Sequence, residues 1–132
     1  MILPQELESK WAIPTLRSMV VKRLIENRSM TQKEVAKKLG ITQPAVSHYA
    51  RNLKGIGSLS SSTQGLSLDR AEVHAFVDKI EALLMKENVD MIEVMAQFNE
   101  ASNYLKKNLM LCDLHRKLDP DPQLRTCEIC KE

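Results

Sequence analysis

Apolar side chains recur at helical spacing early in the chain. In residues 13–28 they stand three or four positions apart, which puts them on one face of an α-helix. Pro14 falls in the first turn, where its missing N–H group costs little. The pattern predicts an amphipathic helix over residues 13–28, with an apolar face formed by Ile13, Leu16, Val20 and Leu24.

The same period returns twice in the second half of the chain. One apolar stripe lies in residues 69–87 and another in residues 90–110, with a break near Asn88. We expect two long helices there, and we expect their flexible methionine side chains to fill the core. His74, beside the first stripe, is expected to be a satisfied or solvated helix histidine and not a metal ligand. The stripes contain Val73, Phe76, Val77, Ile80, Leu83 and Leu84, then Met91, Met95, Phe98, Ser102, Leu105 and Leu109, with Met110 as a further core residue.

The residues between these stretches predict two short helices joined by a tight turn. Thr31 and Glu34 have the spacing of a capping box, which satisfies backbone N–H groups at a helix start. Gly40 stands where a helix must end, and Thr42 stands where another would begin. Residues 30–55 therefore predict a helix-turn-helix.

The composition of this unit suits a DNA-reading helix pair. Ala36 is small where the two helices cross, and the polar face of the second helix carries side chains that can reach base edges. Arginine pairs with guanine and glutamine with adenine in the major groove. A helical hairpin with a solvated polar face, or a protein-binding unit, is the alternative. The expected core is Val35, Leu39, Ile41, Val46 and Tyr49, and the predicted base-reading residues are Gln43, Ser47, His48 and Arg51.

Other residues of this unit are suited to hold the DNA backbone. Hydroxyl, ammonium and backbone N–H groups near helix ends commonly bind phosphates. Such contacts set the register and the salt dependence of binding. The residues assigned to this role are Thr31, Gln32, Lys33, Thr42 and Lys54, and Pro44 at the start of the second helix completes the predicted DNA-binding set.

Three motifs in this region resemble those of a known family. Leu-Pro-x-Glu stands at residues 3–6, Pro-x-x-Arg at residues 14–17, and "LGITQPAVSHY" at residues 39–49. They resemble the N-terminal region of a family of small archaeal helix-turn-helix transcriptional regulators, distantly similar to the phage-repressor type. The resemblance covers roughly the first 55 residues and implies a DNA-binding regulator. Members of that family often end in cysteine pairs, as this chain does.

Charge is distributed unevenly along the 132 residues, although the net charge is only +2. Residues 1–54 carry ten Lys and Arg against four Asp and Glu, whereas residues 55–111 carry five against eight and residues 112–132 four against five. The basic N-terminal part is therefore the expected surface for a polyanion.

Length and composition narrow the class of protein. The chain is long enough for one compact domain, or a small domain with an appendage, and too short for a large multi-domain enzyme. It shows no signal peptide and no run of about 18 apolar residues, so we expect a soluble cytoplasmic protein without a membrane span. No acid/base pair, phosphate-binding glycine loop or nucleophile constellation indicates an enzyme, and no small-molecule substrate is identified.

The predicted organisation is all-α with four segments. Glycine and serine are concentrated in one of them, residues 55–67, which predicts a loop or linker. The segments are a helix-turn-helix DNA-binding domain (1–54), this linker (55–67), a helical dimerisation region (68–111) and a small metal-binding knuckle (112–132).

All three cysteines lie in the last 21 residues, in the stretch "CDLHRKLDPDPQLRTCEIC". Cys112-x2-His115 and Cys127-x2-Cys130 form two pairs, and each pair can converge on one metal ion. The DPDP stretch at residues 119–122 predicts an extended turn between them. Three cysteines cannot all pair within one chain, and reduced thiols are expected inside cells, so a disulfide framework explains them poorly. The four residues are predicted to bind a metal.

The identity of the metal is left open by the spacing. Structural zinc, bound by three thiolates and one imidazole, is the first choice. An iron–sulfur cluster on the same four residues would add a sensing function. A metal-free dithiol switch at Cys127 and Cys130 is a third alternative, although no βαβ pattern surrounds it.

These patterns combine into a homodimeric transcription regulator that binds operator DNA. Helix-turn-helix proteins commonly bind as dimers, because one recognition helix contacts few base pairs, and the long helices offer the surface for that dimer. Two other classes stay open: a protein-interaction scaffold with a zinc knuckle, and a thiol-redox protein that uses Cys127 and Cys130.

Overall fold

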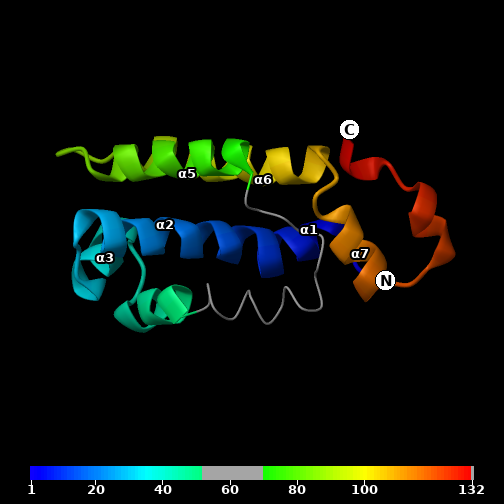
Figure 1. Cartoon of the computed structure of the whole chain (residues 1–132), viewed down its shortest axis with the longest axis horizontal. Helices are drawn as coiled ribbons and strands as arrows, with labels where there is room; N and C mark the ends of the chain where they lie inside the picture. The colour runs from blue at the N-terminus through cyan, green and yellow to red at the C-terminus, as the bar shows by residue number, and fades with distance from the viewer. Residues whose placement is uncertain (52–69, 132) are drawn as a thin grey trace.

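The computed structural model describes residues 1–51 and 70–131 (Figure 1). Every secondary-structure element in these residues is a helix, so the predicted all-α class is confirmed. The predicted linker at residues 55–67 and Lys54 lie outside the described residues. The elements are α1 (Pro4–Leu7), the π-helical turn η1 (Glu8–Ala12), α2 (Ile13–Arg28), α3 (Gln32–Leu39), a helix over residues 43–51, α5 (Ala71–Leu84), α6 (Met91–Lys107), α7 (Cys112–Leu118) and the 3₁₀ turns η2 (Pro122–Thr126) and η3 (Ile129–Lys131).

A nearly continuous helical rod forms the N-terminal part of the molecule. The predicted bounds of 13–28 are those of α2, but α1 and η1 extend the helix back to Pro4. The Leu3 amide donates to the Glu6 carboxylate at 3.2 Å, which satisfies one N–H group at the start of the rod. The rod therefore begins nine residues before the predicted helix.

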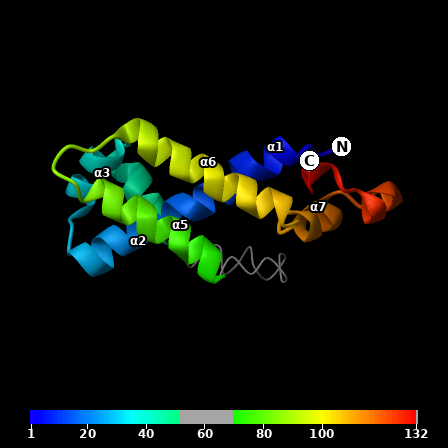
Figure 2. The ribbon, with the colours of Figure 1, turned by 90° about the horizontal axis from the view of Figure 1, so that it is seen from above.

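The second layer is a helical hairpin that lies along this rod. Helices α5 and α6 run side by side in opposite directions, joined by a turn over residues 85–90 near the predicted break (Figure 2). The Asp90 carboxylate caps α6 by accepting from the amides of Ile92 and Glu93, at 3.0 and 3.3 Å. The hairpin covers one side of α2, and the helix over residues 43–51 lies on the other (Figure 1).

Two apolar clusters hold the layers together. The first joins α2 and the helix-turn-helix to the hairpin; its buried members include Leu24, Val35, Val46 and Ile80. The second joins the start of the rod to the far end of the hairpin and to α7; its buried members are Leu7, Ala12, Leu16, Val73, Ala101, Leu105, Met110, Leu111 and Leu114. The helix-turn-helix therefore shares a core with α5 and α6.

The methionines of α6 are the main correction to the predicted core. Met110 is buried as predicted, but Met91 and Met95 are 37% and 59% exposed, while Val94 is 1% exposed. Val94 and the two methionines lie on adjacent sides of one helix, so the apolar pattern allowed two rotations. The compact, β-branched valine packs into the first cluster, and Met91 and Met95 are not among the residues that form it or pack against it.

Ion pairs also join α2 to α5. Glu81 of α5 is only 7% exposed, and its carboxylate lies 2.9 Å from Arg28 Nε and 3.7 Å from Arg23 Nη1. Arg23 also pairs with Asp78 and contacts His74 Nδ1 at 2.9 Å. A buried carboxylate requires such partners, so these contacts fix the hairpin on the rod. The interpretation of His74 as a satisfied helix histidine is confirmed.

None of the described helices is long and apolar enough to cross a membrane.

Candidate functional site

Local capping positions the first helix of the helix-turn-helix. The Thr31 hydroxyl accepts from the Glu34 amide at 3.2 Å, which is one of the two hydrogen bonds of the predicted capping box. Val35 and Ala36, one turn later, are buried in the first cluster. The cap and these two residues set where α3 begins and which face it buries.

Gly40 makes the turn between the two helices. Its φ of 67° is in the left-handed region, which is open to glycine and costs other residues conformational energy. Its amide bonds to the Ala36 carbonyl and closes the end of α3. The predicted turn at Gly40 is confirmed.

The following helix, residues 43–51, presents a polar face next to an apolar one. The Thr42 hydroxyl accepts from the Ala45 amide at 3.2 Å and caps the helix start. Val46 is fully buried, whereas the predicted base-reading residues lie outside the core. Gln43, His48 and Arg51 are exposed and Ser47 is half-buried.

Arg51 already has a partner on its own helix. Its Nε donates to the Ser47 carbonyl at 3.3 Å, which lays the side chain along the helix surface. The His48 ring makes an edge contact with Tyr49, with centroids 5.9 Å apart. The contact with Ser47 uses one of the five N–H groups of the Arg51 guanidinium.

The predicted phosphate contacts lie at the two helix starts. Thr31, Gln32 and Lys33 are exposed at the start of α3, and Thr42 and Pro44 are exposed at the start of the next helix. Helix N-termini carry partial positive charge and unpaired N–H groups, which favour phosphate. The ten predicted DNA-binding residues, apart from Lys54, are therefore on or beside two adjacent helices.

Arg17 of α2 also contacts the helix over residues 43–51, and it is not among the predicted DNA-binding residues. Its Nη1 donates to the Tyr49 hydroxyl at 3.1 Å, which links the rod to the helix over residues 43–51. Arg17 is exposed and adds positive charge beside that helix. The signal that marks it in the sequence is the arginine of the Pro-x-x-Arg motif at residues 14–17.

The three cysteines gather at the other end of the molecule. Cys112 in α7 and Cys130 in η3 are buried and hydrogen-bonded to each other, and Cys127 is close enough to affect both electrostatically. No disulfide joins them. In the sequence, Cys127 and Cys130 are neighbours separated by two residues. In the structure, the hydrogen-bonded partner of Cys130 is Cys112. We call Cys112, Cys127 and Cys130 the thiol cluster.

Burial dominates the acidity of the thiol cluster. It raises the pKa of Cys130 to about 11, with further contributions from the charge and hydrogen bond of Cys112. Burial also raises the pKa of Cys112, although the Arg116 guanidinium opposes this change. Both thiols are therefore protonated at neutral pH in the metal-free chain.

His115, the fourth predicted ligand, faces the N-terminal residues. Its Nε2 donates to the Ile2 carbonyl at 2.6 Å, so Nδ1 carries the lone pair of the neutral ring. The chemistry of Cys112, His115, Cys127 and Cys130 suits zinc. In residues 1–51 and 70–131, however, no group of three or more His, Cys, Asp or Glu side chains is arranged to hold a metal ion. The four-ligand site stays a prediction.

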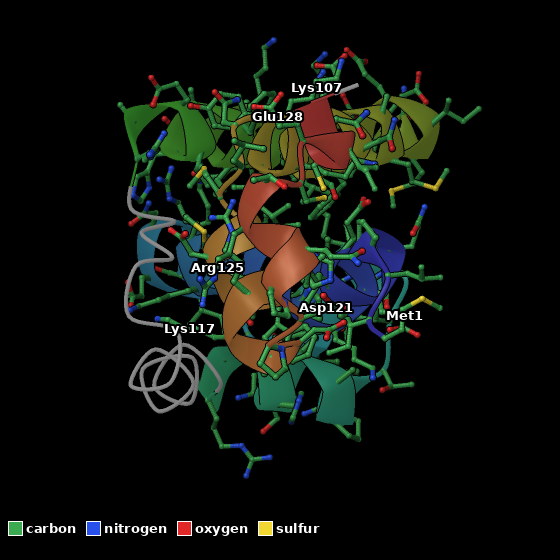
Figure 3. All side chains as sticks on the ribbon, turned by 90° about the vertical axis from the view of Figure 1, so that its right-hand side faces the viewer. Met1, Lys107, Lys117, Asp121, Arg125 and Glu128 are labelled. Atoms are coloured by element: carbon green, nitrogen blue, oxygen red, sulfur yellow. The ribbon has the colours of Figure 1, made fainter. Side chains whose placement is uncertain are left out.

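Hydrogen bonds between tail side chains and the Ile2 backbone tie the chain's first residues to this region. Asp119 accepts from the Ile2 amide at 3.0 Å, one turn beyond His115. Leu111, just before α7, and Leu114, within it, belong with Leu7 to the second cluster. Figure 3 shows the molecule from the end that carries the tail. The tail exposes four charged side chains there: Lys117, Asp121, Arg125 and Glu128. The tail is thus a helical segment packed on the rod, with an extended turn at residues 119–121.

Comparison with known proteins supports the DNA-binding interpretation. Residues 21–58 match the model of a helix-turn-helix family. This segment includes the second half of α2, all of α3 and the helix over residues 43–51. The match supports a DNA-binding transcription regulator, from a family that is not normally enzymatic. No curated protein and no solved structure gives a significant match.

Proposed function

We propose that the protein is a sequence-specific, homodimeric transcription regulator whose recognition helix is the helix over residues 43–51. The observation that carries this proposal is the exposed polar face of that helix, within a segment that matches a helix-turn-helix family. The cap at Thr42, the turn at Gly40 and the buried Val46 hold the helix at a fixed angle to α3. A fixed angle is what a helix needs to enter a major groove.

We assign base contacts and phosphate contacts to different residues according to their side-chain chemistry. Gln43, Ser47, His48 and Arg51 contact base edges, where arginine and glutamine can form bidentate pairs. Residues at the helix starts contact phosphates and give the affinity its salt dependence. Arg17 supports the recognition helix through its hydrogen bond to the Tyr49 hydroxyl.

Homodimerisation is proposed through the outer surface of α6. One recognition helix reads too few base pairs for useful specificity. Ile92, on α6, is 76% exposed, although isoleucine favours burial. Sedimentation of the wild type and of Ile92→Glu tests this part: we expect a dimer that the variant shifts to monomer, and a wild-type monomer with DNA bound would contradict it.

DNA binding can be tested before the operator sequence is identified. Sequences are selected from a random duplex pool with the full-length chain, and affinities are measured by fluorescence anisotropy at several salt concentrations. Arg51→Ala should weaken binding to the selected sequence about 10- to 100-fold and binding to random DNA much less. Arg125→Ala, which removes an exposed arginine of the tail, is the matched control. Equal losses in the two variants, or no salt-dependent affinity, would contradict the proposal.

We also propose that the C-terminal segment binds zinc through Cys112, His115, Cys127 and Cys130, with an iron–sulfur cluster as the alternative. Two observations support it: the thiols already gather, and the His115 Nε2–H is held by a backbone carbonyl, as is usual for a histidine that ligates through Nδ1. Bound zinc would cross-link α7 to η3.

Metal analysis decides this second proposal. Protein purified without oxygen is assayed for zinc, iron and acid-labile sulfide, and its visible spectrum is recorded. About one zinc per chain is expected, with loss of zinc in Cys112→Ser and Cys130→Ser. Brown protein that contains iron and sulfide would show that the four residues hold an iron–sulfur cluster and not zinc. Protein that contains neither zinc nor iron would overturn the proposal.

A further inference from the structure

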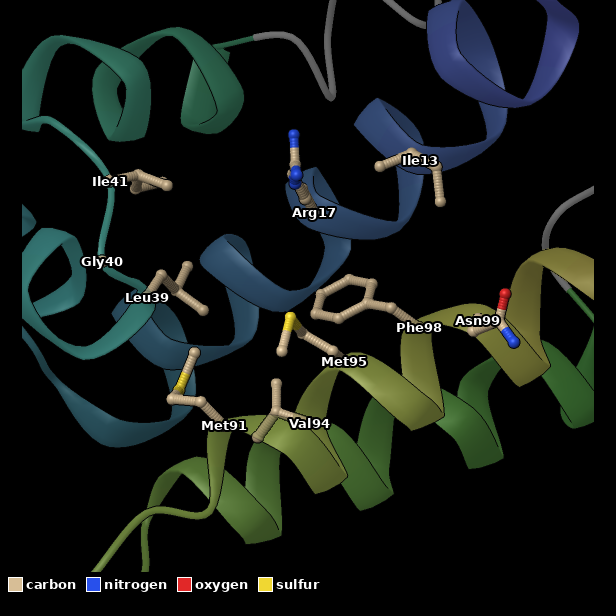
Figure 4. A pocket seen from close by; sticks show the side chains of 10 residues that line it. All are labelled: Ile13, Arg17, Leu39, Gly40, Ile41, Met91, Val94, Met95, Phe98 and Asn99. Carbon is tan, nitrogen blue, oxygen red and sulfur yellow. The ribbon is translucent and has the colours of Figure 1, made fainter. Parts of the chain in front are cut away.

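A groove lies between the rod, the helix-turn-helix and the hairpin (Figure 4). It is bounded by α2, by the turn at residues 39–41 and by the first half of α6, and its volume is about 450 Å³. Small-molecule pockets have volumes of roughly 300–1,000 Å³. The groove therefore has room for a ligand of modest size.

The lining of the groove is apolar and faces inward. Met91, Met95 and Phe98 point from α6 toward Leu39 at the end of α3 (Figure 4). Met95 is the more exposed methionine, at 59%, although its neighbours in the groove are apolar. Methionine adapts to ligands of varied shape, and a ligand in the groove would cover these thioethers.

Arg17 gives the groove its polarity. Among the lining residues in the described part of the chain, Arg17 carries the one charged side chain, and the Asn99 amide is a further polar group. A guanidinium beside an apolar wall favours a ligand with a negative head and an apolar body. The complementary ligand is thus an organic anion.

The same groove touches the parts that position the recognition helix. Arg17 Nη1 donates to the Tyr49 hydroxyl of that helix at 3.1 Å. Gly40 and Ile41, which form the turn between the two helices, line the groove wall. An anion that binds Arg17 would compete with Tyr49 for its N–H groups.

We propose that this groove is an effector site for a small organic anion with an apolar body, such as a medium-chain carboxylate. The carboxylate binds Arg17, the chain lies against Met91, Met95 and Phe98, and the altered Arg17–Tyr49 contact changes DNA affinity. The last step rests on the proposed function, whereas ligand binding does not.

Octanoate and its uncharged analogue octanamide are the probes. Each is titrated into the isotope-labelled full-length chain, and binding is followed by chemical-shift changes. Octanoate should bind saturably and about tenfold more tightly than octanamide, with shifts centred on residues 39–41 and 91–99. Arg17→Gln should remove the preference for octanoate and leave octanamide binding unchanged. Equal affinities for the two probes in the wild type would overturn the assignment to an anion.

A pair of methionine variants locates the site. Met95→Glu places a negative charge in the groove and should weaken octanoate binding at least about tenfold. Met85→Glu makes the same change at an exposed methionine that does not line the groove and should leave octanoate affinity unchanged. Equal losses in both variants, or no saturable binding to the wild type, would overturn the proposal.

DNA affinity measured with and without octanoate tests the coupling separately. A change in affinity for the selected duplex that disappears in Arg17→Gln supports the effector site. Binding of octanoate without any change in DNA affinity overturns the coupling. A chain that binds no DNA refutes the proposed function, and the octanoate titration still decides the site.

Discussion

The helix-turn-helix and the C-terminal tail are held in place by different kinds of contact. In the helix-turn-helix, a hydroxyl cap at Thr31, a left-handed Gly40 and a second cap at Thr42 lie within twelve residues of one another. In the tail, His115 and Asp119 find their partners at Ile2, more than 110 positions away. Local rules therefore determine the first region, whereas the second depends on the tertiary fold.

The two regions also differ in the size of the core that supports them. The helix-turn-helix packs into a cluster that draws on α2, α5 and α6. The tail contributes Leu114 to the second cluster, next to Leu111 just before it, and the last turns of the tail are mostly exposed. We therefore expect the tail to open more readily than the rest of the molecule.

The largest expected effect comes from Leu24→Ala, at the centre of the first cluster. Leu24 is fully buried between the helix-turn-helix and the hairpin, so the cavity should lower the free energy of unfolding by about 3 kcal/mol. Urea denaturation followed by circular dichroism measures it, with Leu24→Met as the volume-conserving control. If Leu24→Ala lowered the free energy of unfolding by less than Leu24→Met does, the helix-turn-helix and the hairpin would not share a core.

Leu114→Ala makes the matching change in the tail. We expect a smaller loss of global stability than for Leu24→Ala, but modification of Cys112 and Cys130 by a thiol reagent should accelerate at least about tenfold. DNA affinity should stay close to that of the wild type. If Leu114→Ala lowered global stability as much as Leu24→Ala, the tail and the helix-turn-helix would form one cooperative unit.

Gly40→Ala tests the local control of the helix-turn-helix. A side chain at Gly40 would meet nothing within 4 Å, so any cost comes from the φ of 67°. We expect about 1 kcal/mol of destabilisation. Gly40→Asn should cost less, because asparagine tolerates this conformation. If the wild type, Gly40→Ala and Gly40→Asn unfolded at the same temperature, the left-handed conformation of Gly40 would not contribute to stability.

The smallest expected effect is a pH dependence of the metal-free chain. Burial raises the pKa of Cys130 from 9.0 to about 11 and also raises that of Cys112. The unfolded chain loses these protons first, so their contribution to stability is complete below pH 9.0 and is lost as pH rises through about 11. Urea midpoints for wild type and Cys130→Ala measure it: the wild type should lose more stability over this range, and parallel curves would contradict the prediction.

The helix-turn-helix could be predicted from the sequence in detail because its signals are short-range. The positions of Thr31, Gly40, Thr42 and Val46 follow from capping, turn and periodicity rules that need only neighbouring residues. The exposure of Gln43, His48 and Arg51 on the helix over residues 43–51 follows from the same helical periodicity. The assignment of these residues to base contacts stays a prediction.

Other features could not be predicted because tertiary contacts decide them. The rod extends to Pro4, since Leu7 and Ala12 find a core made by distant residues. The rotation of α6 buries Val94 in place of Met95, and only packing into the first cluster, which draws on α2, α3 and α5, distinguishes these two rotations. Cysteine spacing predicted that the thiols gather, but it did not predict that Cys130 would pair with Cys112.

The contacts of Ile2 with His115 and Asp119 also bear on the order in which the chain folds. The hydrogen bond between Ile2 and Asp119 spans 117 positions, so it closes a loop of nearly the whole polypeptide. Closing so long a loop is entropically costly until intervening helices have shortened it. We expect the helix-turn-helix to nucleate early and the two ends of the chain to dock last, so that destabilising this contact speeds unfolding and barely slows folding.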